Sequence, residues 1–367
     1  MYLSDYVLNF LEKKKVTNVF TLTGGAICFL IDAFSRNKNM KYTAVAHEQA
    51  AAMMADSYSR LGPNFSATMV TSGPGATNLI TGIACSWFDS IPSLHICGQV
   101  NKYDLASHDV STKKVRQVGF QETDIVSMAK PITKFSYQLK NENEIKYVLE
   151  KAFYLSQEGR PGPVLIDIPM NLQRKIIDPR KLKSFYVKKK SNKKQKLINQ
   201  INKTLSYLKK SKRPVIIVGG GIRLSKTNKE LLFFLKNINI PIVTTWSGVD
   251  AITHDLKNYI GSIGVYGSRA SNFVIQNSDF VLSLGSRLDT RVIGPIPKYF
   301  ARNAIIAAVD IDKHELNKNR GLEIKIKINE NLKDFFSYFK KLSKNTIINK
   351  PEWIQKSILW KKKYPAV

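Results

Sequence analysis

The chain has 367 residues, which is room for two domains, and 43% of them are hydrophobic, an ordinary value for a folded soluble protein. Its formal net charge of +29 raises nucleic acid and anionic membranes as partners. The lysines are spread along the chain, however, as in the Lys-, Asn- and Ile-rich products of AT-rich coding sequences, and no nucleic-acid-binding motif surrounds them. No run approaches the ~18 apolar residues of a membrane span. We therefore expect neither a nucleic-acid nor a membrane partner.

The three cysteines point to a reducing compartment. Cys28, Cys85 and Cys97 all have apolar sequence neighbours, they form no CxxC pair, and their number is odd. They are expected to be reduced core residues of a cytosolic protein. Residues 1–10 lack the basic start and apolar core of a signal peptide, so the prediction is a cytoplasmic protein.

The first half of the chain alternates short apolar runs with helical patterns. The expected strands are Val16–Leu22, Tyr42–Ala46, Phe65–Thr71, Ser93–Gln99 and Pro163–Ile168, and the expected helices are Tyr2–Lys15, Ala26–Arg36, Gln49–Arg60, Asn78–Asp89 and Glu142–Gln157. This alternation predicts an α/β domain with a doubly wound, mostly parallel sheet over residues 1–170. Residues 101–116 are expected to form a surface loop. No role is assigned to His95 or His108, since a lone histidine is more often structural than catalytic.

The stretch around Glu48 carries the first candidate site. Glu48 lies between the expected strand at residues 42–46, predicted to be buried, and an Ala-rich helix, which is the crevice end of a parallel sheet. By itself such a residue is more often a solvated carboxylate at a helix start, favoured by the helix dipole. The next strand enters Gly73-Pro74-Gly75, a tight turn that lets a ligand approach the backbone. Thr77 or Asn78 is available to cap the helix that follows.

These motifs together resemble a known family. HEQAAAMMADSYSR followed by TSGPGATNLITGIACSWFDSIP is similar to the pyrimidine-binding domain of thiamine-diphosphate-dependent enzymes, in the acetolactate synthase group, and the match continues through residues 120–122, 130–134 and 159–169. One loop departs from that group, which usually has Pro-Gly where Thr23-Gly24 stands. This loop lines the family's substrate pocket, and FTLTGGA looks more like the enzymes encoded in surface-polysaccharide clusters. The resemblance implies a 2-keto acid substrate, pyruvate by default, and leaves a sugar-related one open.

The resemblance also implies roles for individual residues. Glu48 would hydrogen-bond the pyrimidine ring and favour the tautomer that removes the thiazolium C2 proton, in a dry pocket between the strand and the helix. Gln121 would face the reacting centre. The residues expected to border the cofactor are Thr71, Pro74, Gly75 and Asn78. The implied reaction is decarboxylation of the keto acid and addition of the product to an acceptor. Because the family's site lies between two subunits, a homodimer or homotetramer is expected.

The second half predicts another α/β domain. Residues 171–192 are polar and basic and are expected to be a linker, with a domain over 193–345 after it. A helix to Ser211, a closing helix Asn331–Leu342, and strands Pro214–Val218, Ile240–Thr245, Phe280–Leu284 and Ala304–Ile311 are expected. Gly219-Gly220-Gly221 after the first strand indicates either a sharp strand–helix turn or the close approach of a phosphate.

Three segments of this domain resemble the central domain of the same superfamily: 261–267, 284–291 and 309–312. In acetolactate synthases they hold FAD, whereas other relatives bind ADP or nothing there, so FAD is a candidate cofactor and not an assigned one. The candidate binding residues are Arg160, Gly219, Gly220, Gly264, Arg287, Arg291 and Asp310. Asp310, at a strand end, would hydrogen-bond a ribose hydroxyl or cap the next helix.

Residues 346–367 are expected to begin a connection to a third domain. In the family that domain carries a Gly-Asp-Gly motif and an Asn that bind Mg²⁺ and the diphosphate. No Gly-Asp-Gly occurs anywhere in the 367 residues. A truncated or split chain is therefore expected, inactive by itself. Two hypotheses remain: a thiamine-diphosphate lyase or transferase completed by a third domain, and a non-catalytic remnant that binds a nucleotide or a partner chain.

Overall fold

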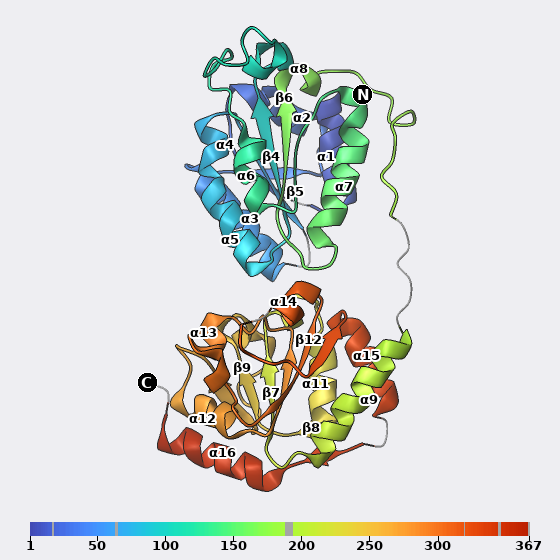
Figure 1. The fold of residues 1–367 in the computed structure, drawn as a ribbon. Helices are drawn as coiled ribbons and strands as arrows, with labels where there is room; N and C mark the ends of the chain where they lie inside the picture. The colour runs from blue at the N-terminus through green and yellow to red at the C-terminus, as the bar shows by residue number, and fades with distance from the viewer. Residues whose placement is uncertain (17, 63–64, 188–193, 319, 344–345, 366–367) are drawn as a thin grey trace. The chain divides into compact units, whose positions relative to one another are not determined.

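A computed structural model describes residues 1–16, 18–62, 65–187, 194–318, 320–343 and 346–365. The chain divides into two units, Met1–Lys189 and Lys190–Val367 (Figure 1). Each unit is a six-stranded parallel sheet with helices on both faces, so the predicted doubly wound α/β class is confirmed.

The first sheet has the strand order β2-β1-β3-β4-β6-β5, and its pairs are all parallel. Its strands are β1 (Asn18–Leu22), β2 (Lys41–Ala44), β3 (Ser66–Val70), β4 (Ser93–Gln99), β5 (Phe135–Gln138) and β6 (Val164–Pro169). The chain runs from β1 to the edge strand β2 and then returns past β1 to β3. The winding therefore reverses between β1 and β3, and the carboxyl ends of these two strands are where such sheets bind ligands.

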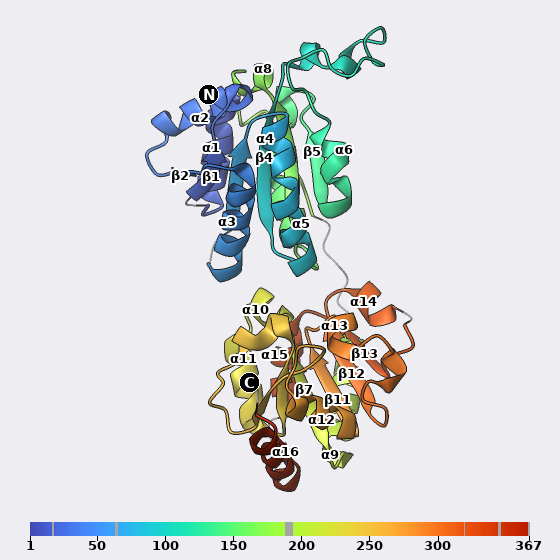
Figure 2. The ribbon, with the colours of Figure 1, turned by 90° about the vertical axis from the view of Figure 1, so that its left-hand side faces the viewer.

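Buried hydrophobic clusters lie on both faces of this sheet, under the helices drawn in Figures 1 and 2. One face carries α1 (Leu3–Lys13), α2 (Cys28–Arg36) and α7 (Ile145–Gln157), and the other carries α3 (Glu48–Leu61), α4 (Pro74–Asn78), α5 (Ile80–Asp89) and α6 (Ile125–Ala129). Short elements complete the unit: α8 (Met170–Gln173), η1 (Gly25–Ile27), η2 (Lys102–Asp104), η3 (Ala106–His108), η4 (Lys130–Ile132) and η5 (Glu142–Glu144). Because both faces are covered, central strands such as β4 are buried along their whole length.

One prediction about this sheet is wrong, and one of its strands was not predicted. The strand expected to be buried at residues 42–46 is β2, an exposed edge strand, and Tyr42 is 49% exposed. An edge strand has only one neighbour, which its apolar sequence does not reveal. The other edge strand, β5, was not predicted because its FSYQ sequence is short and half-buried. The expected surface loop at residues 101–116 is confirmed in that it holds only short 3₁₀ turns, and it extends away from the sheet (Figure 2).

The cysteine prediction holds for one residue of three. Cys97 is buried on β4, whereas Cys28 and Cys85 are exposed, and all three are free. Cys28 and Cys85 lie on helices, where apolar neighbours in sequence turn to different faces, so a residue's neighbours do not fix its own burial.

The second sheet has the order β10-β9-β7-β11-β12-β13, again with parallel pairs. Its strands are β7 (Pro214–Val218), β9 (Ile242–Thr244), β10 (Tyr259–Ser262), β11 (Phe280–Leu284), β12 (Ile305–Asp310) and β13 (Ile326–Asn329), and a separate pair is formed by β8 (Ile238–Asn239) and β14 (Ile348–Asn349). The winding reverses between β7 and β11. The strands β10 and β13 were not predicted.

Helices cover both faces of this sheet as well. α9 (Lys194–Lys210), α11 (Asn228–Asn237) and α15 (Leu332–Leu342) pack on one face, and α12 (Arg269–Asn277) and α16 (Pro351–Lys363) on the other. The shorter helices are α10 (Gly221–Leu224), α13 (Thr290–Ile293), α14 (Lys313–Asn317), η6 (Trp246–Ala251) and η7 (Pro297–Tyr299).

The expected connecting segments are more ordered than their composition indicates. In the 171–192 segment, Ile177 and Leu182 are buried in the first unit's core, and Ile177 N–H donates to the Met1 carbonyl; residues 188–192 lie outside the described residues. Residues 351–363, expected to lead away, form α16 and pack on α12, with the buried Trp353 donating its indole N–H to the Pro214 carbonyl.

Candidate functional site

The first candidate site lies where the winding of the first sheet reverses. The turns that follow β1 and β3 meet there through Gly24 and Thr71: a Cβ atom on Gly24 would lie 2.5 Å from Thr71 Cβ. Ala26 N–H donates to Thr71 Oγ1 over 3.2 Å. Only a glycine at position 24 allows the two turns to come this close.

Glu48 is the first residue of α3 and points into this region. Its side chain is buried, with the residue 7% exposed, and its Oε2 accepts a hydrogen bond from Asn78 Nδ2 at 2.8 Å. His47 precedes it as the helix cap, with Nδ1 accepting from Gln49 N–H at 3.1 Å. The interpretation of Glu48 as a solvated carboxylate is therefore excluded. The helix N-terminus and the Asn78 amide both favour a carboxylate at this position.

The Gly73-Pro74-Gly75 turn forms a cradle beside this carboxylate. A Cβ on Gly75 would lie 3.3 Å from Glu48 Oε1 and 2.7 Å from Thr71 Cγ2, so a side chain would fill the space next to the carboxylate. Gly73 has a φ of +60°, and a Cβ there would lie 2.7 Å from the Cβ of Gln121.

Five of the predicted site residues are thus brought together. Glu48 contacts Asn78 and lies beside Gly75, Gly75 lies beside Thr71, and the exposed Gln121 lies at the rim against Gly73. Pro74 is exposed at the first position of α4, where its fixed φ suits a helix start.

The predicted capping role of Asn78 is wrong. The helix begins at Pro74, four residues earlier than expected, and the cap of α5 is Leu79, without a side-chain bond. Because Asn78 ends α4 instead of starting a helix, its amide is available to Glu48. The Thr77 hydroxyl donates to the Pro74 carbonyl.

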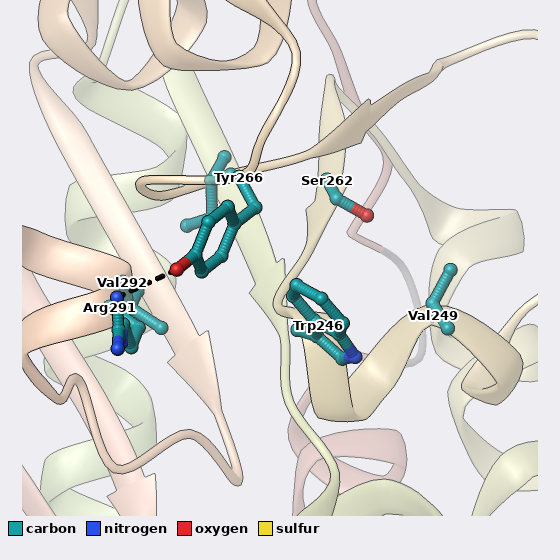
Figure 3. Close-up of a pocket in the computed structure, with 7 residues that line it drawn as sticks. Trp246, Val249, Ser262, Tyr266, Arg291 and Val292 are labelled. Atoms are coloured by element: carbon teal, nitrogen blue, oxygen red, sulfur yellow. Dashed lines mark hydrogen bonds between the residues drawn. The ribbon is translucent and has the colours of Figure 1, made fainter.

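The second unit contains a cavity of about 240 Å³ (Figure 3). It is lined by Trp246, Val249, Ser262, Ile263, Tyr266, Arg291 and Val292. The rings of Trp246 and Tyr266 meet edge to face at 5.3 Å, and Arg291 Nη1 donates to the Tyr266 hydroxyl at 2.9 Å. Arg291 was a predicted cofactor-binding residue, whereas no role was predicted for the two aromatic residues. The position of Trp246, just after β9, was the available signal.

The predicted glycines of the second unit serve close backbone packing. A Cβ on Gly219 would lie 2.3 Å from the carbonyl oxygen of Gly285, and one on Gly220 would lie 2.8 Å from that of Ser247. Gly264, with a φ of +101°, has the Arg291 carbonyl 2.2 Å from such a Cβ. This packing supports the interpretation of Gly219-Gly220-Gly221 as a sharp turn.

The remaining predicted residues do not line the cavity. Arg287 forms an ion pair with Glu315 at 3.2 Å. Asp310, at the end of β12, accepts from Asp312 N–H at 2.8 Å, and it is Asp312 that caps α14, which corrects the alternative role given to Asp310. Arg160 belongs to the first unit, where its Nε donates to Ser90 Oγ at 2.8 Å.

The first sheet buries the side chains of His95 and Asp167 completely, in addition to that of Cys97. His95 bonds Thr68 Oγ1 and Ser93 Oγ through its two ring nitrogens, and burial lowers its pKa to about 3. Burial raises the pKa of Asp167 to about 7, against two hydrogen bonds that oppose the rise. His95 is therefore structural, while His108 is exposed in η3. Sequence analysis did not single out Asp167.

The described residues contain neither a membrane-spanning helix nor a metal-binding cluster. None of their helices is long and apolar enough to cross a membrane. Their His, Cys, Asp and Glu side chains form no group of three or more placed to hold a metal ion.

Comparison with known proteins matches both units to one family. Residues 1–128 match "Thiamine pyrophosphate enzyme, N-terminal TPP binding domain", and residues 201–337 match "Thiamine pyrophosphate enzyme, central domain". The acetolactate synthase large subunit of Cyanidium caldarium is 35% identical over 98% of this chain and 61% of its own length. That of Lactococcus lactis subsp. lactis is 35% identical over 93% of this chain and 60% of its own. The chain thus spans about three fifths of the length of these relatives.

Proposed function

Because this chain belongs to the thiamine pyrophosphate enzymes and carries their N-terminal and central domains, we propose that its first unit forms the pyrimidine side of a thiamine-diphosphate site. The enzyme it serves decarboxylates a 2-keto acid, pyruvate by default, and joins the product to an acceptor, as the names of the acetolactate synthase relatives suggest. The observation that carries this proposal is the buried Glu48 carboxylate beside the side-chain-free Gly75.

The residues present fit the pyrimidine ring. A ring with nitrogen acceptors needs one group able to exchange a proton with it, and Glu48 is such a group, with Oε2 held by Asn78 and Oε1 beside Gly75. The flat ring needs a surface without side chains, which the two glycines of the turn provide. Thr71, whose Oγ1 accepts from the Ala26 N–H, lies beside Gly75.

The chain's own residues then have distinct tasks. Bound thiamine diphosphate would supply a thiazolium carbon that becomes a carbanion. Glu48 holds and releases the proton on the ring nitrogen, and its burial excludes water that would compete for that proton. Asn78 orients the carboxylate, and Gln121, at the rim, faces the substrate. This assignment makes Glu48 and Gln121 the groups that touch the reacting molecules.

The diphosphate and Mg²⁺ need further residues. These 367 residues contain no Gly-Asp-Gly, and the chain spans about 61% of the Cyanidium relative. We therefore propose that the diphosphate and Mg²⁺ ligands lie outside these residues, and that the site is completed between subunits of a homodimer or homotetramer. Light scattering of the native protein checks the assembly, and a monomer that turns over substrate would exclude it. The free thiols fit a cytoplasmic location, which fractionation of the source cells tests.

The test of the proposed function is Glu48→Gln in the native enzyme purified from its source. A glutamine keeps the size and the contact to Asn78 but cannot exchange the proton, so we expect turnover to fall by orders of magnitude with the fold unchanged. Glu352→Gln is the matched control, since Glu352 is also a first-turn glutamate, on α16, but is exposed. Undiminished turnover in Glu48→Gln would refute the mechanism and leave the non-catalytic interpretation.

The cavity of the second unit supports FAD as a second cofactor. Trp246 and Tyr266 offer aromatic edges and faces to a flat ring, and Arg291 offers a cation to its phosphates. The flavin would have a structural part here. Protein incubated with FAD and then desalted should keep a flavin absorbance, and Trp246→Ala should lose it. Absence of flavin absorbance in the unmodified protein removes FAD.

A further inference from the structure

A buried carboxyl group next to the candidate site has no part in the function proposed above. Asp167, on β6, is fully buried, and its neighbours in register are Cys97 on β4 and Gln138 on β5. A buried carboxyl group is costly unless its hydrogen bonds offset the loss of water. The partners of Asp167 therefore indicate what the group does.

One oxygen of Asp167 carries these hydrogen bonds. Asp167 Oδ2 accepts from Gln138 Nε2 at 2.8 Å and from Gln99 Nε2 at 3.1 Å, while Oδ1 has no hydrogen-bond partner. Gln99 Nε2 also donates to the Thr123 carbonyl at 2.8 Å, and Gln99 Oε1 accepts from Val100 N–H at 3.1 Å. Both amide protons and the amide oxygen of Gln99 are thus used, which fixes its side chain in one orientation.

The Thr123 carbonyl lies two residues after Gln121. The turn before it is closed by Glu122, whose N–H donates to the Gly119 carbonyl at 3.1 Å and whose Oε2 accepts from Gly119 N–H at 2.9 Å. Gln121 has a φ of +61° and lies against Gly73. The Thr123 carbonyl is therefore a point at which this segment is tied to the sheet.

We propose that Asp167 is a positioning residue for Gln121. It holds the amide of Gln99, which holds the Thr123 carbonyl, and this link fixes where the Gln121 segment meets the Gly73 turn. The link is a property of the first unit alone. Its meaning for catalysis rests on the proposed function, in which Gln121 faces the substrate.

The two glutamine amides on Asp167 provide a matched pair of variants. Gln99→Leu breaks the link to Thr123, whereas Gln138→Leu removes the other amide and leaves the link intact. Asp167→Leu removes the acceptor, and Asp167→Asn keeps a carbonyl oxygen that can accept from both amides. The measurement is peptide-resolved hydrogen exchange over residues 118–124 in the full chain.

We expect exchange in this segment to be at least tenfold faster in Gln99→Leu and Asp167→Leu, unchanged in Gln138→Leu, and restored in Asp167→Asn. Equal exchange in Gln99→Leu and Gln138→Leu overturns the link. If Asp167→Leu fails to fold, the glutamine pair still decides the matter.

A second readout separates this inference from the proposed function. In the native enzyme, Gln99→Leu should lower kcat about tenfold with the KM for thiamine diphosphate little changed, because Glu48 and Asn78 are untouched. Faster exchange with an unchanged kcat overturns the positioning role. An active Glu48→Gln enzyme refutes the proposed function by itself and leaves the exchange result standing.

Discussion

The two units have the same sheet architecture but differ at the point where the winding reverses. In the first unit, the turns after β1 and β3 meet through Gly24 and the Thr71 side chain, and the buried carboxylate of Glu48 lies beside Gly75. In the second unit, the turns after β7 and β11 meet backbone to backbone: Gly219 N–H donates to Leu284 and Gly221 N–H to Gly285. The reversal point of the first sheet therefore has a carboxylate side chain beside it, whereas that of the second sheet is occupied by main-chain atoms.

This difference shows what a glycine-rich turn does and does not predict. Both Gly73-Pro74-Gly75 and Gly219-Gly220-Gly221 follow apolar strands, and both allow close approach of another group. In the first unit the group near the turn is the ionisable side chain of Glu48, and in the second unit it is the main-chain carbonyl of Gly285. A site is indicated by the turn together with the side chain aimed at it.

The largest expected effect comes from placing a methyl group at each reversal point. Gly219→Ala sets a Cβ 2.3 Å from a backbone oxygen that cannot move aside, so we expect the second unit to lose about 3 kcal/mol of stability. Gly75→Ala sets a Cβ 2.7 Å from the Thr71 methyl and 3.3 Å from Glu48 Oε1, which are side-chain atoms and yield more readily than main chain, so we expect a smaller loss of stability, about 1–2 kcal/mol, and a large loss of turnover.

Urea unfolding followed by tryptophan fluorescence and by peptide-resolved hydrogen exchange measures the two effects separately. Of the four tryptophans, Trp246, Trp353 and Trp360 lie in the second unit and Trp87 in the first, so fluorescence reports mainly on the second unit. If Gly219→Ala is as stable as the unmodified protein, main-chain packing does not require a glycine there. If Gly75→Ala keeps full turnover, the space beside Glu48 is not needed for activity.

Much of the architecture was predictable from the sequence, because central strands buried on both faces consist mostly of apolar residues. The bounds of Ser93–Gln99, Pro214–Val218 and Phe280–Leu284 agree with the structure. Edge strands β2, β5, β10 and β13 were missed or misjudged, since half-exposed strands lack that signal.

The candidate site was predictable only in part. The resemblance pointed to Glu48 and to the Gly73-Pro74-Gly75 turn. A sequence pattern does not show which residues come into contact in the folded chain. The bond from Asn78 to Glu48 depends on where a helix begins, and the link from Asp167 to Thr123 joins residues 44 positions apart. The cavity around Trp246 and Tyr266 depends in the same way on segments that the fold brings together.

Two buried ionisable groups of the first unit should have opposite effects on its stability as the pH changes. Asp167 has a pKa of about 7 against an ordinary 3.8, so the folded state holds its proton and stability falls as the pH rises from about 4 to 7. His95 has a pKa of about 3 against 6.5, so stability falls as the pH drops below 6.5. Between pH 4 and 6.5 the two effects cancel.

Single variants should reveal each effect as a slope on the order of 1.4 kcal/mol per pH unit. Asp167→Asn leaves His95 alone, so the first unit should weaken on acidification from pH 6.5 to 4.5; His95→Gln should weaken as the pH rises over the same range. Urea unfolding at three pH values measures both slopes. If the stability of the two variants changes with pH in the same direction, Asp167 and His95 do not have opposite effects. In the second unit, burial would raise the pKa of Asp279, but hydrogen bonds from Ser211 and the main chain outweigh it and lower the pKa. The ionised Asp279 therefore stabilises the second unit until the pH falls below the ordinary pKa of an aspartate.

The smallest expected effect tests how each unit holds a carboxylate at the end of its sheet. Glu48 is held by a side-chain amide from Asn78, whereas Asp310 is held by the main-chain N–H of Asp312. Asn78→Ala should therefore cost the first unit about 1 kcal/mol and lower turnover, because a buried carboxylate loses its donor. Asp312→Ala removes a side chain that caps α14 but leaves the N–H on Asp310 in place, so exchange of the amides around Asp310 should not change beyond α14. If Asn78→Ala leaves both stability and turnover unaltered, the amide does not orient Glu48, and the carboxylate is held in place by burial and the helix N-terminus.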